Sequence, residues 1–418
     1  MLAPADCLHQ KGSNTLGISL ATELDVAPRE AELLERARAL RPVLAASARK
    51  TEDAGRVGEE TTRLIKEAGL HRLCQPRRFG GLETGPTTWL EVGFELGRAC
   101  GSTGWAVLVG NSCSWFASYW PLEVQEEIWG DSPDNLVCLS GIPTGKAREV
   151  DGGYEIWGSW GYSSNSDNSD WAVVSAVTKF DGAPVTTWFM VEMKDLEIDQ
   201  DSWQVAGLAG SGSKTLIRKE PLFVPHRRVV RLDDITLEAA PGHQIPGNEM
   251  ARWNFSTLGG VILVAPLLGA ARGALDWFVD TMRTKVKTSL KAGSSAPAAA
   301  NPFIQARIGD AAARIDAAMA LLLTGLKVHE TRVRAGDDVS VAERVRLRRD
   351  IGFATRQALE AVTILVEGAS ASATSLDVPL QRFWRDVVAG TRHVTLDVDG
   401  IYAMYGQEQL GMEPIGPH

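Results

Sequence analysis

The chain has 418 residues, a length that supports two or three packed units rather than one small core. Hydrophobic residues make up 44% of it and charged residues 23%, a balance that is typical of a globular protein and excludes a disordered one. The formal net charge of -9 at pH 7 provides no excess of Lys and Arg for binding phosphate groups. We therefore expect no nucleic-acid partner.

The five cysteines are odd in number and show no CxxC spacing. This pattern argues against a disulfide framework and a structural zinc site, so we expect reduced thiols and no metal. No apolar run approaches the roughly 20 residues that cross a bilayer, and the first residues, MLAPADCLHQKGSN, lack the regions of a signal peptide. The sequence predicts a cytoplasmic protein without membrane contact.

The pattern of residues changes three times along the chain. Residues 1–26 lack periodicity and are expected to form a flexible extension. Residues 27–133 repeat apolar residues at helical spacing and predict an N-terminal helical domain. Residues 134–237 hold short Val-, Trp- and Tyr-rich segments between turn residues, which predicts a central antiparallel β domain. Residues 238–418 predict a C-terminal bundle of four long helices, interrupted by a mobile low-complexity loop at 290–302.

The first candidate site is GSWGYSSNSDNSDW, residues 158–171, at the end of a predicted strand. Its hydroxyls and backbone amides could bind the edge of a planar ring while Trp160 or Tyr162 covers the face. The alternative is a turn of Asn and Ser that joins two strands. Both interpretations fit the residue types.

A second candidate is GLAGSGSKTL, residues 207–216, where Ser211, Ser213 and backbone amides could bind a phosphate or a carbonyl group; a Gly-rich hairpin that binds nothing is the alternative. The third is QRFWRDVVAGTRHVTLD, residues 381–397, predicted as the closing helix. It carries His393, whose ordinary pKa suits proton transfer, among residues that would otherwise form surface ion pairs.

No GxGxxG follows a predicted strand, which excludes a Rossmann dinucleotide site. The order of helical domain, β domain and helical bundle instead resembles the acyl-CoA dehydrogenase fold. The details resemble its oxygenase branch, the two-component flavin-dependent monooxygenases related to the 4-hydroxyphenylacetate 3-hydroxylase oxygenase, the secosteroid phenol hydroxylase and the dibenzothiophene monooxygenase. The motifs that carry the resemblance, in chain order, are AGLHRLCQPRRFGG (68–81), GSTGW (101–105), SGIPTGKA (140–147), DGGYEIWGSWGYSSNSD (151–167), GLAGSGSK (207–214), VPHRRV (224–229) and GASASATSLDVPLQRFWRDV (368–387).

The resemblance implies an α+β, mainly α, acyl-CoA dehydrogenase-like fold and an oxygenase component. Such a protein takes reduced FMN or FAD from a separate flavin reductase and uses dioxygen, through a C4a-hydroperoxide, to hydroxylate an aromatic substrate such as a phenol, an indole or a polycyclic compound. The family also implies a homotetramer. The alternatives are an N- or S-oxygenase on the same scaffold, an FAD-dependent acyl-CoA dehydrogenase and a catalytically silent flavin-binding protein.

The resemblance also assigns roles to residues. Ser164 takes the position that bonds to flavin N5, and Arg283 would bind the phosphate. The other expected cofactor contacts are Ser140, Gly141, Trp160, Tyr162, Ser163, Ser211 and Ser213.

Acyl-CoA dehydrogenases often place their catalytic Glu about seven residues after an Arg-Asp pair, and the same count from Arg385 and Asp386 arrives at His393. The resemblance therefore implies that His393 is the catalytic residue here, together with Ser164.

The chain departs from the family pattern at three positions. Asn165 stands for a Gly, Asn168 for a His, and Cys113 for a His that often lies two residues before Trp115. We expect Cys113, Trp115 and Asn168 to contact substrate, and we expect that substrate to differ from a simple phenol.

Overall fold

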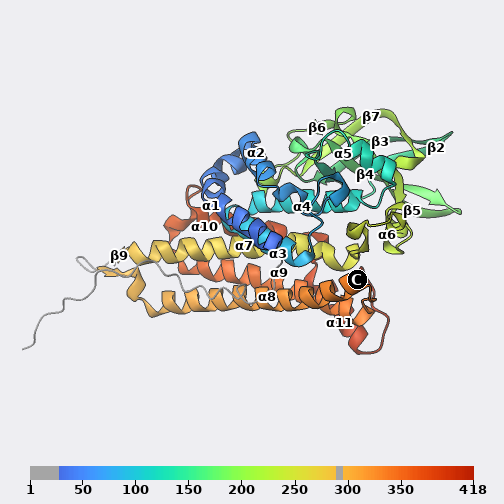
Figure 1. Cartoon of the computed structure of the whole chain (residues 1–418). Coiled ribbons are helices and arrows are strands. Elements are labelled where there is room, and N and C mark those ends of the chain that lie inside the picture. The colour runs from blue at the N-terminus through green and yellow to red at the C-terminus, as the bar shows by residue number, and fades with distance from the viewer. Residues whose placement is uncertain (1–27, 289–294) are drawn as a thin grey trace, which may run out of the picture.

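The computed structural model describes residues 28–288 and 295–418, so the predicted extension and part of the predicted loop, residues 290–294, lie outside the described residues. The described part begins with a group of helices (Figure 1). They are α1 (Pro28–Ala54), α2 (Glu59–Glu67), α3 (Pro86–Ala99), α4 (Gly101–Ala117) and α5 (Leu122–Trp129). Helix α4 is buried on nearly every face, as its apolar composition predicts.

Two four-stranded sheets form the middle of the chain. Their strands are β1 (Val137–Leu139), β2 (Lys146–Val150), β3 (Gly153–Ser163), β4 (Trp171–Phe180), β5 (Ala183–Glu192), β6 (Glu197–Asp199), β7 (Lys214–Pro225) and β8 (Val229–Arg231). One sheet has the order β1-β4-β5-β8 and the other β2-β3-β7-β6. The prediction of antiparallel strands is confirmed except for β1, which pairs parallel to β4.

The C-terminal part contains α7 (Phe255–Thr284), α8 (Pro302–Ala335), α9 (Val341–Gly368), α10 (Pro379–Gly390) and α11 (Val398–Gln409), after a short α6 (Leu232–Thr236). The prediction of four long helices is therefore wrong in number: α7, α8 and α9 are long, but α10 and α11 have only 12 residues each. Strand β9 (Val286–Thr288) pairs antiparallel with β10 (Ser295–Pro297), and β10 lies where we predicted only a loop.

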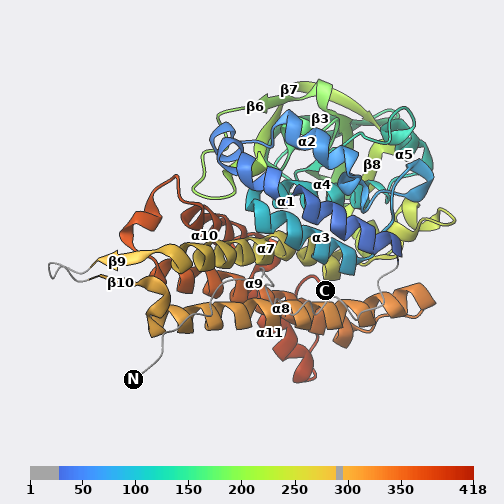
Figure 2. The same cartoon turned by 60° about the vertical axis from the view of Figure 1, so that its left-hand side comes forward.

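Helix α7 lies at the centre of the molecule and contacts α3 on one side and α9 on the other (Figure 2). Gly269 allows this close approach, since a Cβ there would lie 2.1 Å from the Phe94 carbonyl oxygen. We expected no membrane-spanning segment, yet α7 is long and apolar enough to cross a membrane. However, 94% of its most apolar window is buried inside the protein. It is placed as the core helix of a bundle.

Candidate functional site

A bulge near the end of β3 sets the direction of the side chains in the first candidate stretch. The pairing between β3 and β7 is irregular between Trp160 and Ser163, and Tyr162 takes a positive φ of 62°. A bulge of this kind changes which face each following side chain occupies. As a result Trp160 is buried in the β domain, whereas Tyr162 is 71% exposed and lies against Trp203 with ring centroids 6.1 Å apart.

Ser164, directly after this strand, belongs to a chain of three buried serines. Its Oγ lies 2.8 Å from Ser213 Oγ, which in turn lies 2.7 Å from Ser211 Oγ. All three residues are buried. The two predicted stretches, 158–171 and 207–216, therefore meet at one point, although 47 residues separate Ser164 from Ser211.

Trp105 joins this chain to the C-terminal part of the protein. The residue lies in α4, and its Nε1 donates to Ser164 Oγ at 3.4 Å. Its ring also packs against the ring of His393, with centroids 5.9 Å apart and planes tilted by 60°. Three separate segments, the end of β3, α4 and the loop after α10, thus converge on one site.

We predicted that His393 lies inside a helix, but this is wrong, because α10 ends at Gly390. It caps the short turn that follows, and its Nδ1 accepts a hydrogen bond from the Thr395 backbone N–H at 3.2 Å. An accepting Nδ1 carries no proton, so the neutral ring holds its proton on Nε2. Although the residue as a whole is exposed, the loss of hydration around its ring holds the pKa of His393 below its ordinary value.

The Gly-rich loop is fixed to α10. Leu208 N–H donates to Asp386 Oδ1 at 2.6 Å, and burial raises the pKa of that carboxyl to about 6. Arg385 donates to the Ala206 carbonyl and also pairs with Glu52. The arginine and the aspartate of the third candidate stretch therefore position the second stretch and are not merely surface residues.

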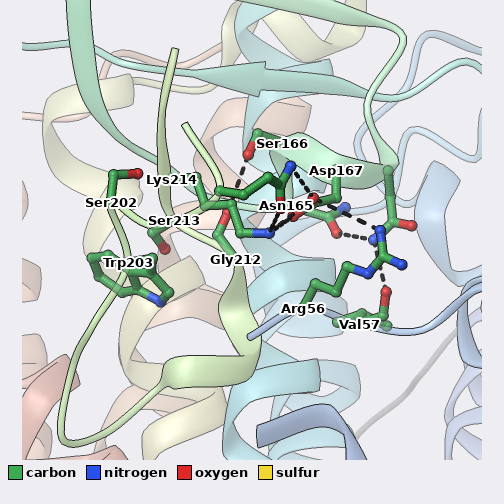
Figure 3. A network of polar contacts seen from close by, with 12 residues as sticks. Arg56, Val57, Asn165, Ser166, Asp167, Ser202, Trp203, Gly212, Ser213 and Lys214 are labelled. Carbon is green, nitrogen blue, oxygen red and sulfur yellow. Dashed lines mark hydrogen bonds and ion pairs between the residues drawn. The ribbon is translucent and has the colours of Figure 1, made fainter. Parts of the chain in front are cut away.

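A second link joins the Gly-rich loop to the turn after β3. Lys214 Nζ lies 2.7 Å from Asp167 Oδ2 and 2.6 Å from Gln200 Oε1, and the lysine and aspartate side chains are almost completely buried (Figure 3). Arg56 approaches the same carboxylate at 3.9 Å. Asn165 begins this turn with φ 62° and ψ 22°, a left-handed conformation that suits Asn as well as Gly. Asn165, which stands where the family has a Gly, is thus compatible with the backbone conformation at this position.

Two predicted cofactor contacts, Trp160 and Ser140, bond to backbone carbonyls of the protein, and a third, Ser163, is fully buried. Trp160 is fully buried and donates from Nε1 to the Ser175 carbonyl at 2.7 Å, so no ring face is left for a ligand. Ser163 is fully buried and its Oγ has no partner among the described residues. Ser140 Oγ donates to the Gly161 carbonyl at 2.7 Å, which fixes the backbone just before Tyr162. Gly141, next to it, is partly exposed and lies near Trp188.

The predicted substrate contacts are also buried or bonded to other protein groups. Cys113 and Trp115 are fully buried in α4, and Trp115 Nε1 donates to the Met250 carbonyl at 2.9 Å. Asn168 uses its amide N–H groups on the Val57 carbonyl and on Asn165 Oδ1. These side chains are placed as core or turn residues in the single chain.

Arg283 lies in the last turn of α7 and is exposed, with an ion pair to Asp280. The end of α7, where β9 begins, lies at the end of the bundle that points away from the β domain (Figure 1). The structure thus does not bring Arg283 to the serine chain within one molecule.

Two elements of the site were missed from sequence. GSTGW was recognised as a motif, but nothing in it indicated that the Trp105 indole would meet a serine 59 residues away. The Lys214–Asp167 pair was missed for the same reason. The signal that could have pointed to the pair is that Lys214 is the one charged residue of stretch 207–216, whereas the charged residues of stretch 158–171 are both acidic.

The site residues fit a flavin. Ser164 uses two of the three hydrogen-bonding positions of its hydroxyl on protein groups, which leaves one for a ligand. Trp105 and the exposed Tyr162 are flat side chains that can pack on a ring system. Within residues 28–288 and 295–418, no group of three or more His, Cys, Asp or Glu residues is arranged to hold a metal ion.

The chain is similar to known proteins in both sequence and fold. Two family models match the chain, the acyl-CoA dehydrogenase N-terminal domain over residues 28–128 and the acyl-CoA dehydrogenase C-terminal domain over residues 261–398. The chain is 34% identical to HsaA of Rhodococcus jostii, a flavin-dependent monooxygenase oxygenase subunit, over 91% of this chain and 98% of the relative. It is also 34% identical to the oxygenase component of the FADH(2)-dependent resorcinol hydroxylase of a Rhizobium species, over 89% and 92%. The crystal structure of 3-HSA hydroxylase from Rhodococcus sp. RHA1 matches with a TM-score of 0.84 at 33% identity, covering 91% of this chain and 97% of that one.

Proposed function

Because the chain belongs to the oxygenase components of the flavin-dependent monooxygenases with the acyl-CoA dehydrogenase fold, we propose that it hydroxylates a flat, uncharged aromatic substrate with reduced flavin and dioxygen. The observation that carries the proposal is the convergence of Ser164, Trp105 and His393 from three separate segments. The relatives' designation as oxygenase components supports a separate reductase as the donor of reduced FMN or FAD.

Reduced flavin, when bound, supplies the two electrons with which dioxygen is split, so that one oxygen atom enters the substrate and the other leaves as water. Ser164 would hold the flavin edge through its hydroxyl, and Tyr162 would pack against the ring. Ser211 and Ser213 support Ser164 from behind rather than contacting the ring themselves. The anchoring of the Gly-rich loop to α10 keeps this edge fixed in place.

His393 is proposed as the catalytic residue. Its Nδ1 is used by Thr395 N–H, so the neutral ring offers an Nε2–H donor to the oxygen atoms of the reaction. A role as a base at Nε2 would need the other tautomer and would break the Thr395 bond. We therefore favour a donor role for His393 over the deprotonation of a substrate hydroxyl.

The substrate class follows from the residues that continue along α4. Phe116 has the helical spacing that places it on the same face as Trp105. It packs against Phe255 and Trp188, with ring centroids 4.7 Å and 5.7 Å away. None of these side chains is charged, and a buried carboxylate without a partner is costly. We propose that a neutral aromatic substrate lies between this cluster and His393.

The test is a panel of paired substrates supplied with ¹⁸O₂ and a flavin reductase. Each neutral phenol, indole or polycyclic compound is compared with a carboxylate-bearing analogue of the same ring. Incorporation of ¹⁸O into the neutral member of each pair is the expected result. Preference for the carboxylates would overturn the substrate class, and the absence of ¹⁸O in every product would overturn the hydroxylation.

We further propose that copies of the chain assemble through the bundle. Phe303 and Val328 of α8 are 76% and 52% exposed in the single chain, which leaves apolar surface on that helix. In such an assembly Arg283 would contact the flavin phosphate of a second copy, since it does not reach the serine chain of its own. Light scattering gives the mass of the assembly, and Phe303→Asp together with Val328→Asp should reduce it. A monomeric parent protein would overturn this assembly.

A further inference from the structure

Arg348 carries a positive charge into the interior of the bundle. It lies in α9 and is 2% exposed, and burial lowers the pKa of its guanidinium to about 10, so the group is still charged at neutral pH. Arg349, and not Arg348, pairs with the adjacent Asp350, and no acidic side chain of the described residues forms an ion pair with Arg348. A buried charge without a counter-ion is costly. Stability therefore does not explain an arginine at this position.

The guanidinium lies between α7 and the turn Val394–Leu396, which follows α10. Gly260 of α7 leaves the space for it, since a Cβ there would lie 2.9 Å from Arg348 Nη1. Arg348 Nη2 donates to the Thr395 carbonyl at 2.9 Å, whereas Nε and Nη1 have no partner among the described residues. The hydrogen bond that this side chain makes is thus directed to the turn.

The same residue of the turn holds the ring of His393. Thr395 donates its backbone N–H to His393 Nδ1 at 3.2 Å. A guanidinium and a backbone N–H can only donate, and a carbonyl can only accept, so the direction of both hydrogen bonds is fixed. Arg348 is therefore linked to the His393 ring through a single residue, Thr395.

The outer side of this turn faces solvent. Arg392, His393 and Val394 are exposed, Val394 to 78%, whereas Leu396 at the end of the turn is buried in the core. Exposed segments with few buried contacts open at little cost in free energy. The bond from Arg348 fixes the peptide of Thr395, one residue before Leu396, to a long helix of the bundle.

We propose that Arg348 is a positioning residue, which holds His393 in its donor orientation through the peptide of Thr395. The inference rests on the proposed function, in which the neutral ring offers Nε2–H to the oxygen atoms of the reaction. Once the Thr395 peptide is released, its N–H no longer requires an unprotonated Nδ1. The ring can then turn away or carry its proton on Nδ1, and the donor at Nε2 is lost for part of the time.

Hydrogen exchange followed by mass spectrometry tests this link without flavin or substrate. The full chain is compared with Arg348→Met, and exchange is measured in peptides that cover residues 391–396. The amides of this segment should exchange at least about fivefold faster in the variant, because the turn opens more often. The melting temperature should stay the same or rise, since a buried charge without a partner is removed.

The second measurement is product per oxygen consumed, with a flavin reductase and the neutral aromatic compound that takes up the most ¹⁸O in the substrate panel. In Arg348→Met this ratio should fall at least about threefold, because the donor is misplaced in part of the molecules. FMN affinity should change less than about twofold, since the hydrogen bonds of Ser164 are untouched.

Arg348→Lys keeps an N–H donor and should regain part of the lost product per oxygen and of the slow exchange. Arg344→Met is the matched control. Arg344 lies one turn earlier in α9, and its Nη1 also donates to a backbone carbonyl, that of Val339, at 3.3 Å. This variant should keep the parent values in both measurements. If Arg348→Met does not fold, Arg348→Gln takes its place, because the shorter glutamine amide does not reach the Thr395 carbonyl.

The outcomes separate the two proposals. Parent-like exchange of residues 391–396 in Arg348→Met overturns the positioning role, and so does faster exchange with an unchanged product per oxygen. Equal effects in Arg344→Met show a general effect of removing a charge from α9 and also overturn it. A parent protein that forms no hydroxylated product overturns the proposed function, and the exchange of residues 391–396 then decides alone whether Arg348 holds the turn.

Discussion

Lys214 and Asp167 form a buried ion pair, with Nζ 2.7 Å from Oδ2, between the Gly-rich loop and the turn that follows β3 (Figure 3). These are the two segments whose serines meet at Ser164 and Ser213. The pair therefore fixes the relative position of the two halves of the serine chain.

Breaking this pair from one side should destabilise the protein strongly. Lys214→Met leaves the Asp167 carboxylate buried with only the more distant Arg56 and the Gln200 amide, a change expected to cost about 3 kcal/mol in the free energy of unfolding. The double variant Lys214→Met with Asp167→Leu should recover part of that loss, because no buried charge is left. Urea unfolding measures both. A single variant that loses less than about 0.5 kcal/mol would contradict a structural role for the pair.

Gly207→Ala should displace the Gly-rich loop. A Cβ at Gly207 would lie 2.0 Å from the Arg385 carbonyl oxygen, and this atom belongs to the backbone of α10 and cannot move aside cheaply. We expect flavin affinity to fall about tenfold, equivalent to roughly 1.4 kcal/mol. Gly309→Ala is the control, because a Cβ there meets nothing within 4 Å. Equal flavin affinity in the two variants would show that the loop is not part of the site.

His393→Ala should separate flavin binding from product formation. The ring contacts Trp105 but makes its only described hydrogen bond to Thr395, so its loss leaves the serine chain intact. We expect product formation to fall about 10²-fold while flavin affinity changes less than about twofold. Oxygen consumption and product are measured together. Unchanged product per oxygen consumed would rule out His393 as the catalytic residue.

The pH dependence of the reaction should reflect the neutral form of His393. Because its pKa lies below the ordinary value, the ring is already uncharged at pH values above about 6.5. Product per oxygen consumed should therefore be constant above that pH and decline only in more acidic solution. His393→Gln has no titrating ring, so its product per oxygen consumed should not show this decline in acidic solution. An unaltered decline in that variant would assign the titration to another group.

Acid should also destabilise the fold through His329. This buried side chain of α8 stacks on Trp253, and burial lowers its pKa to about 4. The unfolded chain therefore binds a proton that the folded chain does not, between about pH 6.5 and 4, and stability falls as the pH falls through that window. At pH 5 the loss is about 2 kcal/mol. His329→Phe should show a smaller decrease in melting temperature between pH 7.5 and pH 5; an identical decrease would contradict this assignment.

The order of the three parts of the chain could be predicted because apolar periodicity is a local property of the sequence. The position of His393 outside a helix was harder to predict from the sequence, although Gly390 could have indicated the end of α10. The exposure of Tyr162, two residues after the buried Trp160, depends on the bulge in β3, which shifts the alternation of side chains and has no clear mark in the residue types. The Trp105 and Lys214 contacts join segments 59 and 47 residues apart and therefore required the fold.

The most direct measurement of the central claim is rapid mixing of the protein and reduced FMN or FAD with oxygenated buffer, followed by the release of hydrogen peroxide. A flavin held by Ser164 beside His393 should release peroxide more slowly than free reduced flavin. When a neutral aromatic substrate is present, hydroxylated product should form in place of peroxide. Peroxide release that is as fast with the protein as without it, in the presence and absence of substrate, would contradict the account.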